Sequence, residues 1–156
     1  MTTLFTRRRL MRYIPLLLWM ALISFASTNS FSASNTSRFI RPLLIWLFPQ
    51  ISEERIAVFH FLVRKVSHFS EYAILGFLAA RTFSSSSQRL LRNYWLQTTL
   101  ILIVSYALLD EFHQSFVSSR TASIYDSLID ISGGVFALLW FAYFKSRKGD
   151  NYRPSD

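Results

Sequence analysis

The sequence predicts an all-α polytopic membrane protein with about four transmembrane helices and a short interfacial or re-entrant segment. The chain of 156 residues is 51% hydrophobic and 17% aromatic, while only 17% of its residues are charged. Its mean hydropathy of +0.27 is high for a soluble domain. The apolar residues gather in four stretches flanked by Lys and Arg, as is typical of helices that cross a bilayer. The length predicts one domain.

The four expected spans cover residues 13–26, 58–80, 94–109 and 124–144. A helix needs ~20 residues to cross the bilayer core, so the first and third spans require flanking residues to complete them. An alternative for the first stretch is a cleaved signal peptide, because residues 7–33 combine a basic start, a short apolar run and small residues. That alternative leaves three spans and places the mature N-terminus outside the cell.

A short apolar segment at residues 42–49 lies between the first two spans and is bounded by prolines. It is too short to span, so we expect it to lie at the membrane interface or to re-enter the membrane, with Trp46 at headgroup level. Ser52 then precedes Glu53 and Glu54, which is typical of a helix N-terminus. The second helix is therefore expected to begin near Glu53, before the span itself.

The distribution of Lys and Arg predicts the orientation. Most of them lie near the N-terminus, in residues 81–92 and in the C-terminal tail, and the positive-inside rule assigns these regions to the cytoplasm. We therefore expect a basic cytoplasmic N-terminus at residues 1–12, a membrane domain at 13–144 and a cytoplasmic tail at 145–156. This anchoring explains the net charge of +8, so nucleic acid is not an expected partner.

Ionisable residues inside the expected spans are the most informative feature of the chain. Each costs ~2.5–3.5 kcal/mol on insertion, so such residues are rare and usually functional. In the second span, Lys65, His68 and Tyr72 fall at i, i+3 and i+7 and share one helix face, which Glu71 borders. Under the predicted orientation, these four residues lie in the outer half of the span.

A second group of polar residues follows at the same depth. It closes the third span, continues through the next loop and ends on one face of the fourth span: Asp110, Glu111, Gln114, Arg120, Asp126 and Asp130. Gly133 and Gly134 come after it on that face and allow a neighbouring helix to approach closely. We therefore predict a single polar cluster just below the extracytoplasmic surface.

Carboxylates outnumber cations in this predicted cluster. Lys65 and Arg120 are set against five carboxylates, those of Glu71 and the four acidic residues of the second group, so the formal sum is −3. Surplus buried carboxylates must be protonated, hydrated or neutralised by a bound cation. A divalent cation on their oxygens is one alternative. The chain has no Cys and no compact metal motif, however, and we expect no metal and no cofactor.

Three motifs carry a resemblance to the VanZ-like family of small bacterial integral membrane proteins. They are RKxxHFxEYxxLG at residues 64–76, DExxQxF at 110–116 and RxxSxxDxxxDxxG at 120–133. The resemblance covers roughly residues 58–144. It implies a compact helical domain in the bacterial cytoplasmic membrane and a role in the cell envelope, because the founding member is associated with teicoplanin resistance.

Two positions depart from the family's pattern. The family often has Gly before the loop arginine, whereas Ser118 and Ser119 precede Arg120 here, which puts the turn geometry in doubt because Gly adopts positive φ cheaply. Asp130 stands where the family often has Asn, and it adds one carboxylate to the cluster. The resemblance does not by itself transfer antibiotic resistance to this chain.

Three functional classes fit these residues. The favoured one is binding of a lipid headgroup or a lipid-linked cell-wall precursor, with membrane lipids as partners. The predicted ligand-binding residues are Lys65, His68, Glu71, Tyr72, Asp110, Glu111, Gln114, Arg120, Asp126 and Asp130. The second is an intramembrane enzyme with Glu71, His68 or Asp126 as acid or base, although no nucleophile stands beside a base. The third is a structural network that only locks the helices together.

Overall fold

The computed structural model describes residues 11–28, 33–116 and 123–150. Within these residues the fold is all-α, as predicted, and contains no strand. The helices are α2 (Ile14–Ala26), α3 (Ala33–Leu47), α4 (Glu53–Ser84), α5 (Arg89–Asn93), α6 (Trp95–Gln114) and α7 (Ile124–Asp150).

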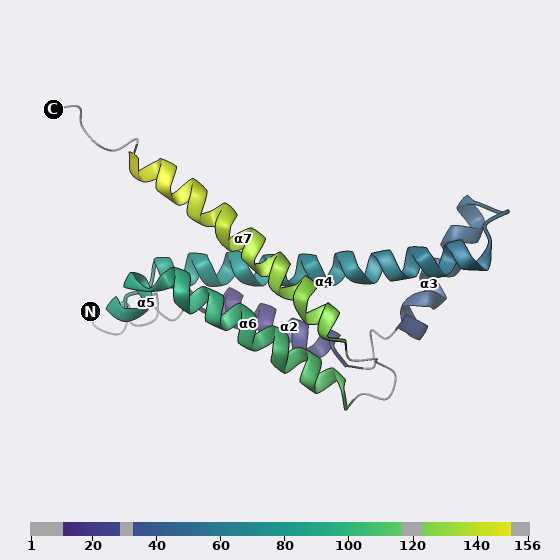
Figure 1. Cartoon of the computed structure of the whole chain (residues 1–156), viewed down its shortest axis with the longest axis horizontal. Helices are drawn as coiled ribbons and strands as arrows, with labels where there is room; N and C mark the ends of the chain where they lie inside the picture. The colour runs from purple at the N-terminus through teal and green to yellow at the C-terminus, as the bar shows by residue number, and fades with distance from the viewer. Residues whose placement is uncertain (1–10, 29–32, 117–122, 151–156) are drawn as a thin grey trace.

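Helix α4 is the centre of the molecule (Figure 1). Its 32 residues extend for about 48 Å at 1.5 Å per residue, well beyond the ~30 Å of a bilayer core. Helix α7 crosses α4 and makes the largest interface with it, while α6 packs on both and α2 lies against α4. Every other packed helix therefore takes its position from α4.

Among the described residues, two helices are long and apolar enough to cross a membrane: Trp95–Gln114 and Ile124–Arg147. A third or less of each is buried inside the fold, whereas the core helices of soluble proteins are mostly buried. Helix α2 is apolar but has only 13 residues. Helix α4 is interrupted by charged side chains. The expected count of four spans stays a prediction.

An arm made of α3 and the first half of α4 projects from the packed helices (Figure 1). The predicted start of α4 is confirmed: Ser52 Oγ accepts a hydrogen bond from the Arg55 N–H at 3.4 Å. Arg41 forms an ion pair with Glu53, in which the guanidinium donates a hydrogen bond to the carboxylate. This hydrogen bond holds the pKa of the Glu53 carboxyl below its usual range. The pair joins the two helices of the arm at its tip.

The short apolar segment at residues 42–49 is mostly helical, because Pro42 lies inside α3, which begins at Ala33. Proline has no backbone N–H, so α3 lacks one backbone hydrogen bond at this position. The interfacial or re-entrant position of the segment stays a prediction. Leu44 is buried, whereas Trp46 is 76% exposed. The apolar part of α3 therefore has one buried side and one exposed side.

Small residues let α4 and α7 approach closely, as the sequence indicated. Gly76 faces the backbone of Gly134, and Gly133 faces the backbone carbonyl of Phe69. A Cβ at either position would overlap the opposite backbone. The hydrophobic core forms beside this contact from Tyr72, Leu75, Ala79, Ile103, Ala107 and Leu138, and α2 contributes Leu16 and Ile23.

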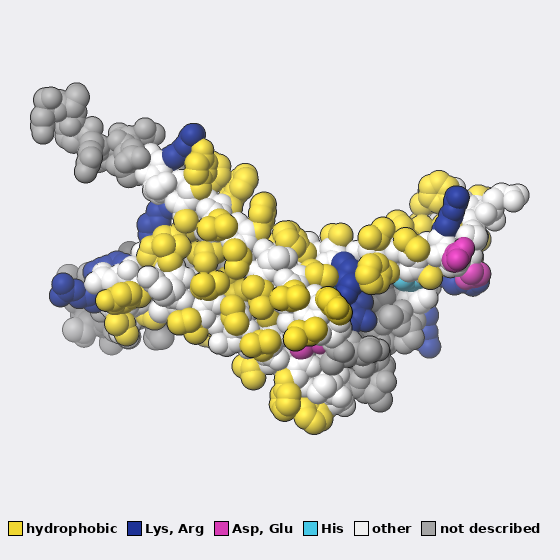
Figure 2. All heavy atoms as spheres, viewed as in Figure 1, with side chains coloured by type: hydrophobic (Ala, Val, Ile, Leu, Met, Phe, Trp, Pro, Cys, Tyr) yellow, Lys and Arg dark blue, Asp and Glu magenta, His cyan; other side chains and the backbone are white. Residues whose placement is uncertain are grey.

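Large apolar side chains cover much of the molecular surface (Figure 2). Ile101 and Leu109 on α6 and Trp140 on α7 are each more than half exposed. Soluble monomers rarely expose apolar surface of this extent. This surface suits contact with lipid.

Candidate functional site

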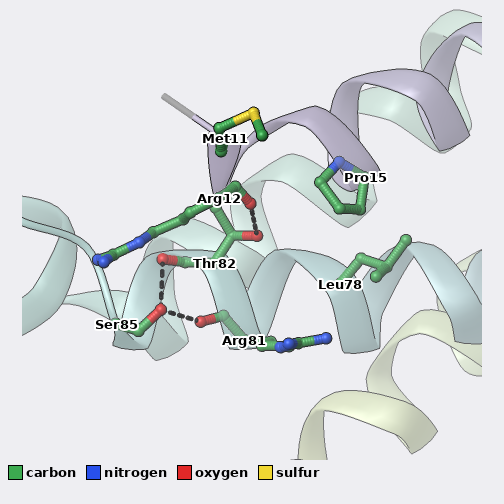
Figure 3. Close-up of a pocket in the computed structure, with 7 residues that line it drawn as sticks. All are labelled: Met11, Arg12, Pro15, Leu78, Arg81, Thr82 and Ser85. Carbon is green, nitrogen blue, oxygen red and sulfur yellow. Dashed lines mark hydrogen bonds between the residues drawn. The ribbon is translucent and has the colours of Figure 1, made fainter. Parts of the chain in front are cut away.

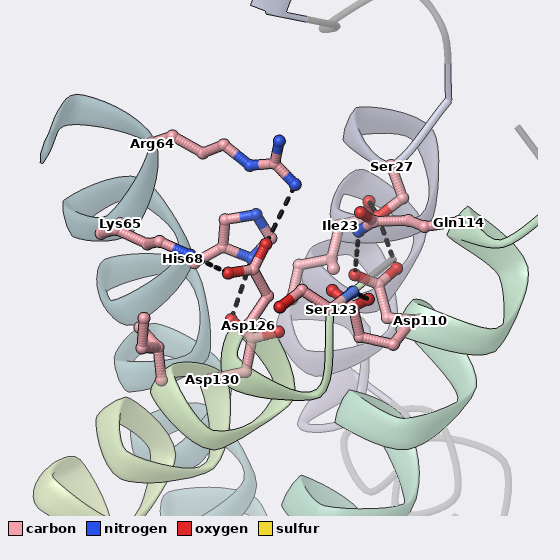
Figure 4. A network of polar contacts seen from close by, with 12 residues as sticks. Ile23, Ser27, Arg64, Lys65, His68, Asp110, Gln114, Ser123, Asp126 and Asp130 are labelled. Carbon is pink, nitrogen blue, oxygen red and sulfur yellow. Dashed lines mark hydrogen bonds and ion pairs between the residues drawn. The ribbon is translucent and has the colours of Figure 1, made fainter. Parts of the chain in front are cut away.

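Four helices bring polar side chains together where α6 ends and α7 begins (Figure 4). We call this group the polar cluster; it consists of Ser27, Arg64, Lys65, His68, Tyr72, Asp110, Glu111, Gln114, Ser123, Asp126 and Asp130. The described acidic members are all buried: Asp110 and Glu111 are 7% exposed, Asp126 2% and Asp130 0%. The predicted convergence of the two groups of polar residues is therefore present in the fold.

Asp126 is the ion-pairing centre of the polar cluster. Arg64 Nη2 donates to Asp126 Oδ2 at 3.0 Å, and Lys65 Nζ forms an ion pair with Oδ1. The cations are less buried than the carboxylate, because the Arg64 and Lys65 side chains keep 30% and 21% of their surface exposed. Two adjacent residues of α4 thus form ion pairs with one residue in the first turn of α7.

His68 and Asp130 repeat this arrangement one helical turn further along. His68 Nδ1 and Asp130 Oδ1 are 3.0 Å apart, and both side chains are buried. His68 follows Lys65 by three residues on α4, and Asp130 follows Asp126 by four residues on α7. Both contacts therefore join the same face of α4 to the same face of α7. His68 therefore has a hydrogen-bond partner on the neighbouring helix α7.

Asp110 sits on the other side of the polar cluster and receives two hydrogen bonds. Gln114 Nε2 donates to Asp110 Oδ2 at 2.8 Å, and Ser27 Oγ donates to Oδ1. Because Ser27 caps the end of α2, this contact ties α2 to the end of α6. Gln114 is a partner for a carboxylate, as predicted.

Glu111 links α6 to the start of α7. Its Oε2 accepts a hydrogen bond from the Ser123 backbone N–H at 2.7 Å, and the Ser123 carbonyl accepts from the Asp126 N–H at 2.8 Å. A carboxylate therefore holds the chain just before the first turn of α7. Asp130 also lies within electrostatic range of Asp110 and Asp126, so the two sides of the polar cluster interact.

Several buried polar atoms of the polar cluster have no hydrogen-bond partner among the described residues. They are Tyr72 Oη, Glu111 Oε1, Gln114 Oε1, Asp130 Oδ2 and Arg64 Nε. Burying a polar atom without a partner is costly, and most buried polar atoms in proteins are paired. These atoms therefore mark where the polar cluster can receive a further group.

Two predicted site residues are not included in the polar cluster as defined above. Arg120 lies outside the described residues. Glu71 is partly buried at the edge of the face that it was expected to border, and its backbone carbonyl accepts a hydrogen bond from Trp19 Nε1 at 2.9 Å. The remaining predicted residues all belong to the polar cluster.

Ser27 and Arg64 were not predicted as site residues. Arg64 had a signal, because it stands in the RKxxHFxEYxxLG motif directly before Lys65. Ser27 had none, because a serine after an apolar stretch is ordinary and its contact with Asp110 depends on how α2 packs. Among the described residues, no three His, Asp or Glu side chains converge closely enough to hold a metal ion.

A cavity of about 230 Å³ lies at the C-terminal end of α4, away from the polar cluster (Figure 3). Arg12 and Arg81 line it, but Figure 3 shows their guanidinium groups pointing away from each other. The hydroxyls beside them already donate to backbone carbonyls: Thr82 Oγ1 to Arg12 at 3.4 Å and Ser85 Oγ to Arg81 at 2.7 Å. This cavity therefore lacks convergent polar groups.

Comparison with known proteins identifies a family. The family model described as VanZ/LLP1 matches residues 13–145, most of the chain, and confirms the resemblance carried by the three motifs. The match also includes α2, which the motifs do not cover. No curated protein and no solved structure matches the chain.

Proposed function

Because the chain belongs to the VanZ/LLP1 family, we propose that it is a multi-pass protein of the bacterial cytoplasmic membrane that binds a headgroup at the polar cluster. The headgroup belongs to a membrane lipid or to a lipid-linked cell-wall precursor. Family membership and two long apolar helices support the membrane location. The placement of Lys and Arg supports cytoplasmic termini, which puts the polar cluster on the extracytoplasmic side.

One observation carries this proposal: buried charge is combined with buried polar atoms that lack partners. The polar cluster contains four carboxylates whose residues are at most 7% exposed. Four of its five unpartnered atoms also belong to residues that are at most 7% exposed. A network that served only to lock helices would be expected to satisfy its own atoms, since each unsatisfied one costs about 1–3 kcal/mol. A ligand that completes these bonds explains their arrangement.

Native mass spectrometry of the protein in mild detergent tests the proposal. We expect a lipid or lipid-linked molecule to co-purify with the wild type and to be lost from Lys65→Ala. Arg55→Ala is the matched control, because Arg55 is an exposed cation of the same helix outside the polar cluster. Equal amounts of the same molecule on all three proteins would favour the structural alternative.

A second candidate, acid–base catalysis on an envelope lipid, rests on the pair of His68 and Asp130. A carboxylate that orients an imidazole is a common arrangement in enzymes that move protons. Asp126 is engaged by two cations, so His68 is the better candidate for the acid or base. Incubation with bacterial lipid extracts would then yield a new lipid mass with the wild type and none with His68→Gln; identical extracts would rule out this candidate.

The connection to glycopeptides comes from the family alone. We propose that the chain affects teicoplanin susceptibility through the molecule held at the polar cluster. Deletion should change the minimal inhibitory concentration of teicoplanin, and complementation with Lys65→Ala should fail where complementation with Arg55→Ala succeeds. If the deletion strain kept its susceptibility to teicoplanin, this protein would have no role in resistance. Headgroup binding is tested separately by the mass spectrometry experiment above.

A further inference from the structure

We infer that the group bound at the polar cluster is a hydrogen-bond-donating amine, of the kind that phosphoethanolamine carries, and not a bare phosphate. The assignment rests on the proposed function and names the chemistry of its ligand. It follows from three properties of the described cluster: its charge, the kind of atom left without a partner, and the engagement of its cations.

The charge of the described cluster favours a cation. Arg64 and Lys65 provide two positive charges against the carboxylates of Asp110, Glu111, Asp126 and Asp130, which leaves a formal sum of −2 with neutral His68. Both cations are engaged by the single carboxylate of Asp126. The other three carboxylates have no Lys or Arg partner among the described residues, so they would repel an anion. An ammonium group would be attracted to them.

The unpartnered atoms favour a donor. Three of them accept hydrogen bonds when the carboxyl groups are ionised: Glu111 Oε1, Gln114 Oε1 and Asp130 Oδ2. The Gln114 assignment follows from chemistry, because its other atom meets Asp110 Oδ2 at 2.8 Å and a carboxylate oxygen requires the NH₂ group to face it. A primary ammonium offers three N–H donors and no acceptor. The Tyr72 hydroxyl can accept as well, whereas only Arg64 Nε is restricted to donating.

Other occupants fit less well. A phosphate needs donors, and among the buried unpartnered atoms only Arg64 Nε and the Tyr72 hydroxyl can donate. A water molecule can satisfy the acceptors but does not balance the charge. An amine meets both the charge and the hydrogen-bond requirement.

A series of lipids that share one phosphate tests this assignment. Purified full-length protein is titrated with short-chain phosphatidylethanolamine, phosphatidylcholine and phosphatidylglycerol, and binding is followed by native mass spectrometry. Phosphatidylcholine has the same net charge as phosphatidylethanolamine but no N–H donor, and phosphatidylglycerol has hydroxyls without the cation. We expect phosphatidylethanolamine to bind about tenfold or more tightly than either, because the lost bonds leave buried acceptors unpaired.

Variants locate the preference at the polar cluster. Glu111→Gln and Tyr72→Phe should each lower the preference for phosphatidylethanolamine severalfold, and Tyr72→Phe removes only a hydroxyl without a described partner, so the fold is retained. Glu54→Gln is the matched control, because it removes an exposed carboxylate from α4 outside the polar cluster. Soluble phosphoethanolamine is added as a competitor: displacement of the lipid identifies the amine headgroup itself as sufficient, and absence of displacement shows that the acyl chains are required.

The outcomes separate the two proposals. Preferential binding of phosphatidylglycerol that is lost in Lys65→Ala would overturn the amine assignment and support headgroup binding. Equal binding of phosphatidylethanolamine and phosphatidylcholine would overturn the amine assignment too. Lipid binding that no variant of the polar cluster changes would overturn both. A preference for phosphatidylethanolamine that Glu111→Gln weakens and Glu54→Gln leaves unchanged supports both.

Discussion

The substitution Asp126→Asn tests whether ion pairing at the polar cluster holds α4 and α7 together. It keeps the size and most of the polarity of the side chain but removes the charge that Arg64 and Lys65 share. Both cations then lose their partner in a region where Asp126 itself is 2% exposed. The interface between α4 and α7 is the largest in the fold, so its loss affects the whole molecule.

The expected magnitude follows from burial. Removing one partner of a fully buried ion pair costs about 3–5 kcal/mol, because a charge is left without compensation. Here the Arg64 and Lys65 side chains are 30% and 21% exposed and can turn toward solvent or headgroups, so the expected loss in the free energy of unfolding is about 1–3 kcal/mol.

The free energy of unfolding is measured by titrating the protein in mixed micelles with a denaturing detergent and following helicity by circular dichroism. A double-mutant cycle with Lys65→Met isolates the ion pair, and the coupling energy should be at least about 0.5 kcal/mol. Glu54→Gln controls for loss of a carboxylate and should leave stability within about 0.5 kcal/mol. If Asp126→Asn matched that control, the ion pairs would not contribute to holding the two helices.

Three further predictions concern contacts near the polar cluster and in the arm. Gly133→Ala should destabilise the fold by about 1–3 kcal/mol in the same unfolding assay, because the added Cβ would overlap the Phe69 carbonyl. Ser132→Ala changes an exposed neighbouring residue and should be nearly neutral. If the two variants lowered the free energy of unfolding equally, the close contact at Gly133 would be refuted. Ser27→Ala removes one hydrogen-bond donor to buried Asp110 and should lower the free energy of unfolding by about 1–2 kcal/mol. Ser85→Ala, at an exposed serine, should lower it less. If Ser27→Ala left the free energy of unfolding unchanged, α2 would not be held in place through Asp110. The arm should loosen in acid: the folded-state pKa of Glu53 lies below its unfolded value, so its pair with Arg41 contributes fully above the unfolded pKa and is lost as pH falls through the folded pKa. Spin labels on paired cysteines, introduced on α3 and α4 of this cysteine-free chain, should report a broader distance distribution in acid, and Glu53→Gln should show that distribution at neutral pH; a distribution independent of pH would contradict the role of the pair.

Local sequence patterns were sufficient for the helical faces. The i, i+3 and i+7 spacing placed Lys65, His68 and Tyr72 on one face of α4, and the spacing of four placed Asp126 and Asp130 on one face of α7. Both predictions hold because the period of an α-helix determines which residues share a face, whatever surrounds the helix. The capping role of Ser52 holds for the same reason, since a cap depends on a few neighbouring residues.

Local patterns failed where a position depended on a distant part of the chain. The prolines at the two ends of residues 42–49 gave no sign that a helix begins at Ala33 and continues through Pro42. Ser27 was not expected at the polar cluster, because its position depends on how α2 lies against α4 and α6. The choice of partner for each carboxylate was left open for the same reason.

The sequence by itself determined the helical class, the family resemblance, the convergence of the polar residues at one end of the helices and a close helix approach at Gly133 and Gly134. Hydropathy, helical period and residue size are sufficient for these, because each acts locally along the chain. The tertiary structure decided that α4 is the helix that approaches Gly133. Only the tertiary structure decided that Arg64 and Lys65 both pair with Asp126, that His68 meets Asp130 and that several acceptors stay unpaired. Hydrogen bonds and ion pairs act over about 3 Å, so they depend on the rotation and sliding of whole helices, which the sum of all packing contacts sets.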